Sequence, residues 1–331
     1  MLDVYTADCL DGAELERPSM IVEDLLPAGL TVFAGSPKLG KSWLALLLCC
    51  CVANQNPFLG RETLEGGVLY LDLEGSRYRL QDRLSQLGLG FPEYLTVSHT
   101  APQLGQGLLE DVQRWQDYSK AYPRLVVIDT VARIKPPARR GFNAYENDSK
   151  IFAPLQEYAM SNGIAIVLVT HLNKADRLNG SGADWVERIS GSMGLAGVSD
   201  NIWGLFRQRG SETAYLRTSS RDVDAGDMVL SFENGLWKFV SDDMDGYEFN
   251  QRPLVRFIVS EQTLQGTAAE LCDKYLAFCQ SQGLSHGLSD NQPVAGFGKQ
   301  LKRLKPELWR VRKSMRVTKN SDATRYWIAG F

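Results

Sequence analysis

One stretch of the chain combines glycines, lysines and a hydroxyl at a spacing suited to phosphate chemistry. It fits the pattern G-x-x-x-x-G-K-[ST] at every position. Its residues are Gly35, Ser36, Pro37, Lys38, Leu39, Gly40, Lys41 and Ser42. Successive backbone N–H groups of such a loop surround nucleotide phosphates at the positive end of a helix dipole. Lys41 then supplies a cation for the β- and γ-phosphate oxygens, and the Ser42 hydroxyl supplies a ligand for Mg²⁺.

Hydrolysis of a nucleotide also needs an acid for Mg²⁺ and a carboxylate that orients the attacking water. Asp129 closes the apolar run Leu-Val-Val-Ile-Asp and is the acid predicted to hold the metal with Ser42. A strand-end aspartate that caps the next turn is the alternative. We prefer Glu74 as the water-orienting carboxylate, because Asp129 is followed by Thr130 rather than by a glutamate. Asp72 is its competitor, and a solvated acid at a helix start is the other interpretation of Glu74.

The flanking sequence predicts the elements that position these residues. An apolar strand at 30–34 leads into the loop, and a helix at 43–53 without glycine or proline leads out of it. Further strands are predicted at 66–74, 95–98, 124–129 and 164–170, with helices between them. Their consecutive apolar residues suit strands that are covered on both faces, as in a parallel sheet. The alternation predicts a doubly wound, mostly parallel α/β domain with ligands at the carboxyl ends of the strands.

The pattern changes after residue 200. Short strands separated by turns are predicted at 201–207, 213–218, 228–232 and 236–240. They suggest an antiparallel extension of the same sheet. We therefore predict three parts: an α/β core at 1–245, a linker at 246–264 and a small C-terminal domain at 265–331.

The composition is ordinary for a globular protein, with 44% hydrophobic and 23% charged residues among 331. The longest apolar run, 43–53, is about half of a membrane span, so no membrane contact is expected. The acidic first residues lack the features of a signal peptide. Six cysteines, three of them adjacent at 49–51, show no C-x-x-C spacing and are interpreted as core thiols. These features predict a cytoplasmic protein without a disulfide framework.

The net charge of −3 conceals an asymmetry along the chain. Residues 296–331 contain ten basic and two acidic side chains, a net charge of +8, which leaves −11 for residues 1–295. The C-terminal end is therefore electrostatically distinct from the rest of the chain.

Five motifs occur in an order that resembles a known family. They are the phosphate loop, Tyr-Leu-Asp-Leu-Glu74, Leu-Val-Val-Ile-Asp-Thr130, Val-Thr-His171-Leu-Asn-Lys174, and the stretch 189–200, Ile-Ser-Gly-Ser-Met-Gly-Leu-Ala-Gly-Val-Ser-Asp. Over residues 20–240 the chain resembles the RecA-type P-loop ATPases of the RepA group, plasmid and phage replicative helicases related to the DnaB and KaiC cores. The resemblance implies a RecA-like fold, hydrolysis of ATP with Mg²⁺, a ring of about six subunits, and single-stranded DNA in the ring pore.

The same resemblance assigns roles to single residues. It implies a catalytic glutamate at Glu74 and a sensor histidine at His171, which would hydrogen-bond the γ-phosphate. A purely structural histidine is the alternative. The segment 172–192 falls where the family has its pore loop, and it carries Lys174, Arg177 and Arg188. A plain flexible surface loop is the alternative for this segment.

The resemblance also implies an arginine finger that reaches the γ-phosphate of the neighbouring subunit. The candidates on the late strands are Arg207, Arg209, Arg217 and Arg221. Some RepA relatives carry an arginine just after the Asp-Asn step, where this chain has Trp203. We prefer Arg221 because of its position after the Leu-Arg-Thr-Ser-Ser strand.

The basic tail has a pattern of its own. The apolar residues Val294, Phe297, Leu301 and Leu304 fall on one face of a predicted helix, and basic residues fall opposite. Two short strands around an Asn-Ser-Asp turn follow, and together they resemble a winged helix; a basic solvated helix with a hairpin is the alternative. The residues expected to contact DNA, with duplex DNA one candidate ligand, are Lys299, Lys302, Arg303, Arg316, Lys319 and Arg325.

These observations leave three functions open. The first is an ATP-hydrolysing hexameric DNA helicase or translocase similar to replication proteins of mobile elements. The second is an ATP-switched DNA-binding or loading protein without unwinding activity. The third is a KaiC-like ATPase that acts on protein, in which DNA has no effect on turnover.

Overall fold

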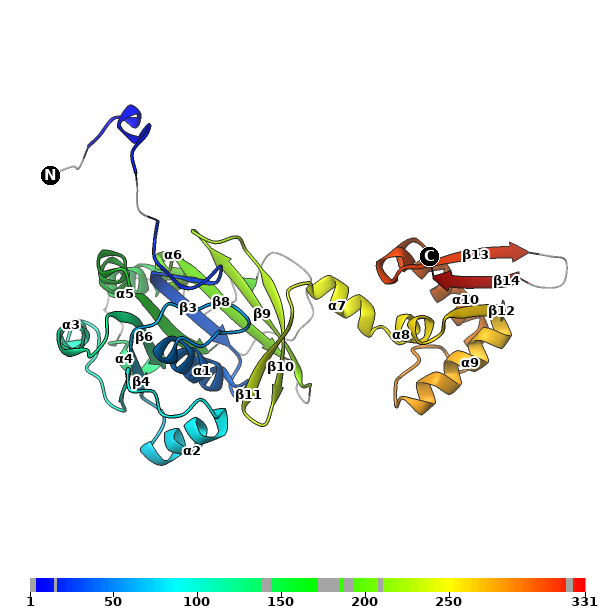
Figure 1. Ribbon diagram of the computed structural model, residues 1–331, viewed down its shortest axis with the longest axis horizontal. Helices are drawn as coiled ribbons and strands as arrows, with labels where there is room; N and C mark the ends of the chain where they lie inside the picture. The colour runs from blue at the N-terminus through cyan, green and yellow to red at the C-terminus, as the bar shows by residue number, and fades with distance from the viewer. Residues whose placement is uncertain are drawn as a thin grey trace. The chain divides into compact units, whose positions relative to one another are not determined.

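The computed structural model describes residues 4–14, 17–137, 144–171, 185–186, 193–207, 211–319 and 324–330. The chain divides into two compact units, Met1–Asp242 and Asp243–Phe331 (Figure 1). A short 3-10 helix, η1 (Ala7–Leu10), and a two-stranded sheet of β1 (Met20–Val22) and β2 (Leu26–Pro27) precede the main fold. Within the described residues, no helix is both long enough and apolar enough to span a bilayer.

In the described part of the first unit, nine strands form one sheet in the order β11-β10-β9-β8-β3-β7-β6-β4-β5. The parallel strands are β3 (Gly29–Gly35), β4 (Gly67–Asp72), β5 (Leu95–Ser98), β6 (Pro123–Asp129), β7 (Ala165–His171) and β8 (Asn201–Arg207). The antiparallel strands are β9 (Thr213–Ser220), β10 (Asp227–Glu233) and β11 (Leu236–Ser241). The sheet confirms the predicted α/β fold, mostly parallel with an antiparallel extension.

Helices cover both faces of this sheet. One face packs against α1 (Lys41–Asn54) and α2 (Arg77–Leu87), and the other against α3 (Leu108–Tyr118), α5 (Ala144–Asn162) and α6 (Met193–Val198). The short helix α4 (Val131–Ile134) follows β6. Alternate residues of β6 serve the two layers, because Val127 lies in the core with α1 and Val126 in the core with α5. The consecutive apolar residues in the sequence therefore match strands that are buried on both faces.

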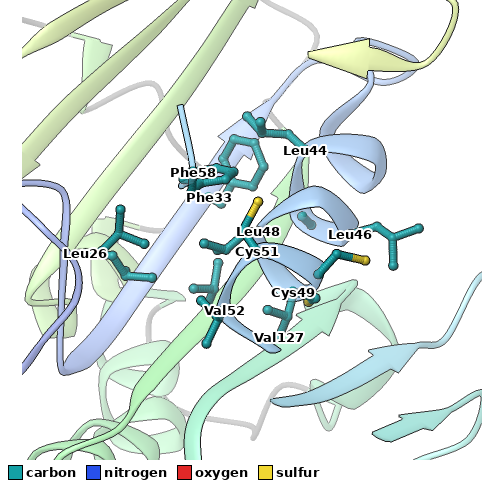
Figure 2. Close-up of a cluster of buried hydrophobic side chains, with 14 of the residues drawn as sticks. Leu26, Phe33, Leu44, Leu46, Leu48, Cys49, Cys51, Val52, Phe58 and Val127 are labelled. Atoms are coloured by element: carbon teal, nitrogen blue, oxygen red, sulfur yellow. The ribbon is translucent and has the colours of Figure 1, made fainter. Parts of the chain in front are cut away.

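Helix α1 is buried almost all round, which explains why its sequence is apolar on every face. Leu44, Leu48 and Val52 pack in one cluster with Phe33 of β3 and Val127 of β6 (Figure 2). The adjacent thiols Cys49–Cys51 lie in the same core, and burial raises the pKa values of Cys50 and Cys51 to about 12. They are free, protonated core thiols, as predicted, and Cys272 and Cys279 are buried as well. Cys9, also predicted to be a core thiol, is exposed.

The second unit joins a three-stranded antiparallel sheet to several helices. Its elements are α7 (Met244–Gln251), α8 (Pro253–Ser260), β12 (Thr263–Thr267), α9 (Ala268–Ser281), α10 (Pro293–Leu304), the 3-10 helix η3 (Lys305–Val311), β13 (Lys313–Lys319) and β14 (Thr324–Gly330). The strand order is β12-β14-β13. Thr267 and Glu270 form a reciprocal capping box at the start of α9.

The segment 246–264, predicted to be a linker, has a defined secondary structure. It contains most of α7, all of α8 and the start of β12. Helix α8 buries Val255, Phe257 and Ile258 in the core of the second unit. This apolar face makes α8 part of that unit.

Candidate nucleotide-binding site

The phosphate loop lies where β3 ends and α1 begins, and a Cβ atom at either of its two glycines would lie too close to neighbouring atoms. A Cβ atom at Gly35 would lie 2.9 Å from the backbone oxygen of Leu205 on the neighbouring strand β8. Gly40 has a φ of +96°, and a Cβ atom there would lie 3.1 Å from ring atoms of both Phe232 and Trp237. The loop is therefore held close to β8 and to the hairpin of β10 and β11.

The ammonium group of Lys41 lies inside this loop. Its Nζ donates hydrogen bonds to the backbone oxygens of Gly35 (2.8 Å) and Ser36 (3.0 Å). Burial lowers the pKa of Lys41 to about 8, and the carboxylates of Asp129 and Glu74 oppose this shift. The structure thus brings together the loop lysine and both acids that the sequence singles out.

His171, the last residue of β7, meets the same lysine. It pairs with Gly35 in the register of β3 and β7, and its Nδ1 lies 3.2 Å from Lys41 Nζ. Because an ammonium group only donates, Nδ1 accepts, and the neutral ring carries its proton on Nε2. Burial, followed by the charge of Lys41, lowers the pKa of His171 and favours this neutral form. His171 therefore offers an N–H donor beside the loop.

Asp129 lies at the carboxyl end of β6 and is buried. Its Oδ2 accepts a hydrogen bond of 3.2 Å from the hydroxyl of Tyr70, a residue of β4. The Thr130 hydroxyl donates to the backbone oxygen of Val169 on β7 at 2.8 Å, which fixes the turn after Asp129. Tyr70 was not among the residues singled out from the sequence, because its contact depends on the pairing of β4 with β6.

The two candidates for the water-orienting carboxylate differ in their surroundings. Asp72 is buried and pairs with Asp129 across β4 and β6, and its pKa is raised by burial and then by Asp129. The side chain of Glu74 is 48% exposed, with Oε1 3.9 Å from Arg133 Nε. An attacking water has to come from solvent, so the accessible carboxylate of Glu74 suits that role better than the enclosed Asp72.

Two of the acids lie together at this edge of the sheet, although the described residues contain no group of three or more His, Cys, Asp or Glu side chains that could hold a metal ion. Among the described residues, the buried Oδ2 of Asp72 has no hydrogen-bond partner, and His99 Nδ1 lies 3.6 Å away from it. This oxygen belongs to the carboxylate paired with Asp129, so two buried carboxylates lie side by side. Such hard oxygen ligands, with a hydroxyl near the phosphates, suit Mg²⁺. Asp129 is one of these carboxylates, and it remains, with Ser42 in the first turn of α1, one of the two residues predicted to hold Mg²⁺.

The arginine candidates lie at different edges of the sheet. Arg221 follows β9, which runs antiparallel to β8, so it lies at the amino end of β3 rather than at the phosphate loop. Its side chain contacts Asp200 Oδ1 (3.4 Å) and the backbone oxygen of Gly197 (3.1 Å). Arg217 pairs with Asp227 at 3.5 Å. Arg207 lies at the loop edge, with Cζ 4.9 Å from the ring centroid of Phe232. Arg209 lies outside the described residues.

The hairpin of β10 and β11 contacts the phosphate loop directly. The indole Nε1 of Trp237 on β11 donates to the backbone oxygen of Gly40 at 3.0 Å. The ring centroids of Phe232 and Trp237 are 4.5 Å apart, and both rings lie against the loop at Gly40. No sequence signal identified Trp237, because its contact joins residues 197 positions apart.

The basic residues predicted to contact DNA do not all lie on one surface of the second unit. Helix α10 buries Phe297, Leu301 and Leu304 and exposes the three basic residues expected to contact DNA: Lys299, Lys302 and Arg303. On the sheet, Arg316 and Arg325 occupy positions of one face, and the register places Lys319 on the other. The Asn-Ser-Asp turn lies outside the described residues, as do Lys174, Arg177 and Arg188 of the predicted pore loop.

Comparisons with curated proteins give partial matches. DNA repair protein RadA of Streptococcus pneumoniae is 26% identical over 157 residues, which is 47% of this chain and 33% of RadA. RadA of Streptococcus pyogenes is also 26% identical, over 30% of its length. The chain thus spans about a third of the length of these relatives.

Solved structures share the fold of the first unit. The "ATPase Domain of G40P" has a TM-score of 0.53 at 16% identity and covers 65% of this chain and 85% of its own. A DnaB-like replicative helicase, described with its interactions with primase, has a TM-score of 0.52 at 15% identity, over 64% of this chain and 58% of its own. Both show that the fold is RecA-like.

A protein-family model described as an AAA domain matches residues 2–177, which is more than half of the chain. The matched range contains the phosphate loop and the residues Glu74, Asp129 and His171. The chain belongs to this AAA-domain family, and its fold is the RecA-like fold that the G40P ATPase domain and the DnaB-like helicase share.

Proposed function

We propose that this chain binds ATP with Mg²⁺ at residues 35–42, hydrolyses it, and acts on DNA as a ring-forming helicase or translocase similar to replication proteins of mobile elements. The observation that supports this most strongly is the convergence of four side chains at one edge of the sheet. Lys41 contacts His171 directly, and the carboxylates of Asp129 and Glu74 act on the pKa values of both.

In the proposed reaction each residue has a limited task. The backbone N–H groups of the loop and the Lys41 ammonium bind the β- and γ-phosphates. Mg²⁺, when bound, neutralises charge that develops on the phosphate oxygens. Glu74 accepts a hydrogen bond from the attacking water and orients it toward the γ-phosphorus. His171 donates its Nε2–H to a γ-phosphate oxygen and so distinguishes ATP from ADP.

The ring assembly is proposed from the sequence resemblance to RepA-type helicases and from the position of one arginine. Arg221 lies at the sheet edge opposite the chain's own phosphate loop, which leaves the nucleotide of a neighbouring subunit as its proposed partner. A ring of about six subunits would place it at the next subunit's γ-phosphate, with single-stranded DNA in the pore.

One observation favours the second candidate function, an ATP-switched DNA-binding or loading protein without unwinding. Arg221 contacts Asp200 and Gly197 of its own chain, which stabilises it in place. Without an arginine supplied by the neighbour, specific ATPase activity stays constant with protein concentration. A finger that acts between subunits makes the activity rise with concentration and fall in Arg221→Ala.

A strand-displacement assay separates the two functions. The substrate is a labelled partial duplex, incubated with the full chain and with ATP, ADP or no nucleotide. Displacement that requires ATP supports the helicase. DNA binding and ATP turnover without displacement, on substrates with either single-stranded end, would replace the helicase with the loading protein.

A further inference from the structure

The three-stranded sheet of the second unit has one covered face and one open face (Figure 1). The covered face carries Leu264, Met315, Tyr326 and Ile328, which pack in the core with the helices. Strand alternation then places the intervening residues on the open face. The strand register groups them in rows across the sheet.

The central row of the open face contains Gln265, Trp327 and Arg316, one from each strand. The row beside it contains Thr267, Arg325 and Thr318. The side chain of Trp327 is 38% exposed although it sits on the middle strand. The other residues of these two rows are polar, and Ala329 lies on the same face in the third row. A large aromatic ring that remains exposed in the centre of such a face contributes little to the core of the unit.

The charge around this ring is positive. Arg316 and Arg325 are both exposed, and Cζ of Arg316 lies 5.4 Å from the centroid of the Trp327 ring. Glu270 interacts with Arg325, and its carboxylate also accepts a hydrogen bond from the Thr267 backbone in the capping box. Cationic groups beside an accessible aromatic ring match the chemistry of a nucleic-acid strand, which alternates phosphates with flat bases.

We propose that this open face binds single-stranded nucleic acid, with one base stacked on Trp327 and the flanking phosphates bound by Arg316 and Arg325. The amide of Gln265 and the hydroxyls of Thr267 and Thr318 lie within the same rows and offer hydrogen bonds to base edges or sugars. This inference rests on the proposal that the second unit binds DNA, and it specifies the strand state of the ligand.

The geometry favours a single strand over a duplex. A ring on a sheet stacks against the face of a base, and in a duplex these faces are covered by neighbouring base pairs. The basic face of α10 has a different character, because its exposed residues Lys299, Lys302 and Arg303 offer charge without an aromatic ring. Exposed basic side chains such as these contact the phosphates of single-stranded and of duplex nucleic acid.

Two tryptophans of the same unit supply a matched test. Trp309 on η3 is 66% exposed and is not part of the sheet, so Trp309→Ala removes an exposed indole elsewhere. Binding of short fluorescent oligothymidylate and oligouridylate, and of a duplex of equal length, is measured with the full chain. The variants are Trp327→Ala, Trp327→Phe and Trp309→Ala, and thermal unfolding checks the fold of each one.

Loss of the stacking ring should weaken single-strand binding by roughly 5- to 150-fold in Trp327→Ala. Trp327→Phe keeps a ring and should keep most of the affinity, and Trp309→Ala should bind like the wild type. Equal losses for single strand and duplex, or equal losses in Trp309→Ala and Trp327→Ala, would overturn the inference.

A second variant separates this inference from the proposed function. If Lys302→Glu with Arg303→Glu abolishes DNA binding while Trp327→Ala leaves single-strand affinity unchanged, the unit binds DNA through α10 and the open face is not a site. If neither variant changes binding of any probe, the proposed DNA-binding role of the second unit fails as well. A loss confined to oligouridylate in Trp327→Ala would support the face as an RNA site.

Discussion

At the scale of residues, the low pKa of the Lys41 ammonium leads us to expect that the proposed nucleotide binding depends on pH. Burial lowers its pKa to about 8 in the nucleotide-free chain. Phosphates bind the charged form, so below this pH the ammonium is ready to bind and above it a proton must be taken up. We expect affinity for a non-hydrolysable ATP analogue to be constant up to about pH 7 and to fall by at most about tenfold per pH unit above about pH 8.

The matched control for this pH dependence is Lys41→Met, which lacks the titrating group. Its affinity should be weak and independent of pH over the same range, since the phosphates of the analogue are already ionised there. Titration by fluorescence or calorimetry measures both proteins. A wild-type profile as flat as that of Lys41→Met would show that the lysine does not titrate in this range.

The roles assigned to Glu74 and Asp72 predict different kinetic defects when each carboxylate is replaced. Glu74→Gln should bind Mg–ATP normally and hydrolyse it about 10²-fold more slowly, because only the group that orients water is lost. Asp72→Asn removes a charge next to Asp129 and should act mainly on the dependence of turnover on Mg²⁺ concentration. Single-turnover hydrolysis at saturating and limiting Mg²⁺ measures both effects. Normal turnover in Glu74→Gln together with slow turnover in Asp72→Asn would reverse the assignment.

At the scale of elements, the hairpin of β10 and β11 stabilises the phosphate loop through one hydrogen bond. Trp237→Phe keeps an aromatic ring beside Phe232 and removes the donor to Gly40. A net hydrogen bond contributes about 1 kcal/mol, so the melting temperature should fall by about 2–4 °C and affinity for ATP should weaken by a few-fold. The neighbouring exposed Lys238→Ala is the control. If both variants melt and bind alike, the hairpin does not support the loop.

The elements that the sequence predicts well are those with a strong local signal. Runs of apolar residues ended by Gly35, Asp129 and His171 marked buried strands and the edge at which they meet, and the structure has these strands. Contacts that depend on how the strands pair could not be predicted from the sequence. Tyr70 reaches Asp129 only because β4 pairs with β6, and Trp237 reaches Gly40 only through the late hairpin.

The sequence at 253–260 contains a signal for helix α8, although these residues were predicted to belong to a linker. Leu254, Val255, Phe257 and Ile258 follow the spacing of one helix face, and Pro253 stands at the first turn, where proline is favoured. The apolar face of this helix is the reason that the second unit begins near Asp243 in the structure rather than after residue 264.

At the scale of the whole molecule, the two compact units allow the proposed ATP hydrolysis and the proposed DNA binding to be tested separately. A chain that ends at Asp242 keeps every described residue of the nucleotide site and should keep basal ATP hydrolysis. Its affinity for duplex DNA should fall. If three or four basic residues of the second unit contact phosphates, the full chain's log affinity falls with log salt with a slope of roughly −3 to −4, and the truncated chain's slope is flatter.

The charge reversal Lys302→Glu with Arg303→Glu tests the same surface without truncation. It leaves the buried residues Phe297, Leu301 and Leu304 intact and should not unfold the unit. Filter binding at several salt concentrations measures affinity and slope. Unchanged values in both the truncated and the reversed protein would place DNA contact on the first unit.

The loop at residues 35–42 and its converging side chains are proposed to hydrolyse ATP. The most direct measurement is steady-state ATP turnover of the full chain with Mg²⁺, compared with Lys41→Ala. Removal of the main protein cation at the phosphates should lower turnover by about 10²-fold or more, while the circular dichroism spectrum of the variant remains that of the wild type. Turnover in Lys41→Ala equal to that of the wild type would contradict the account.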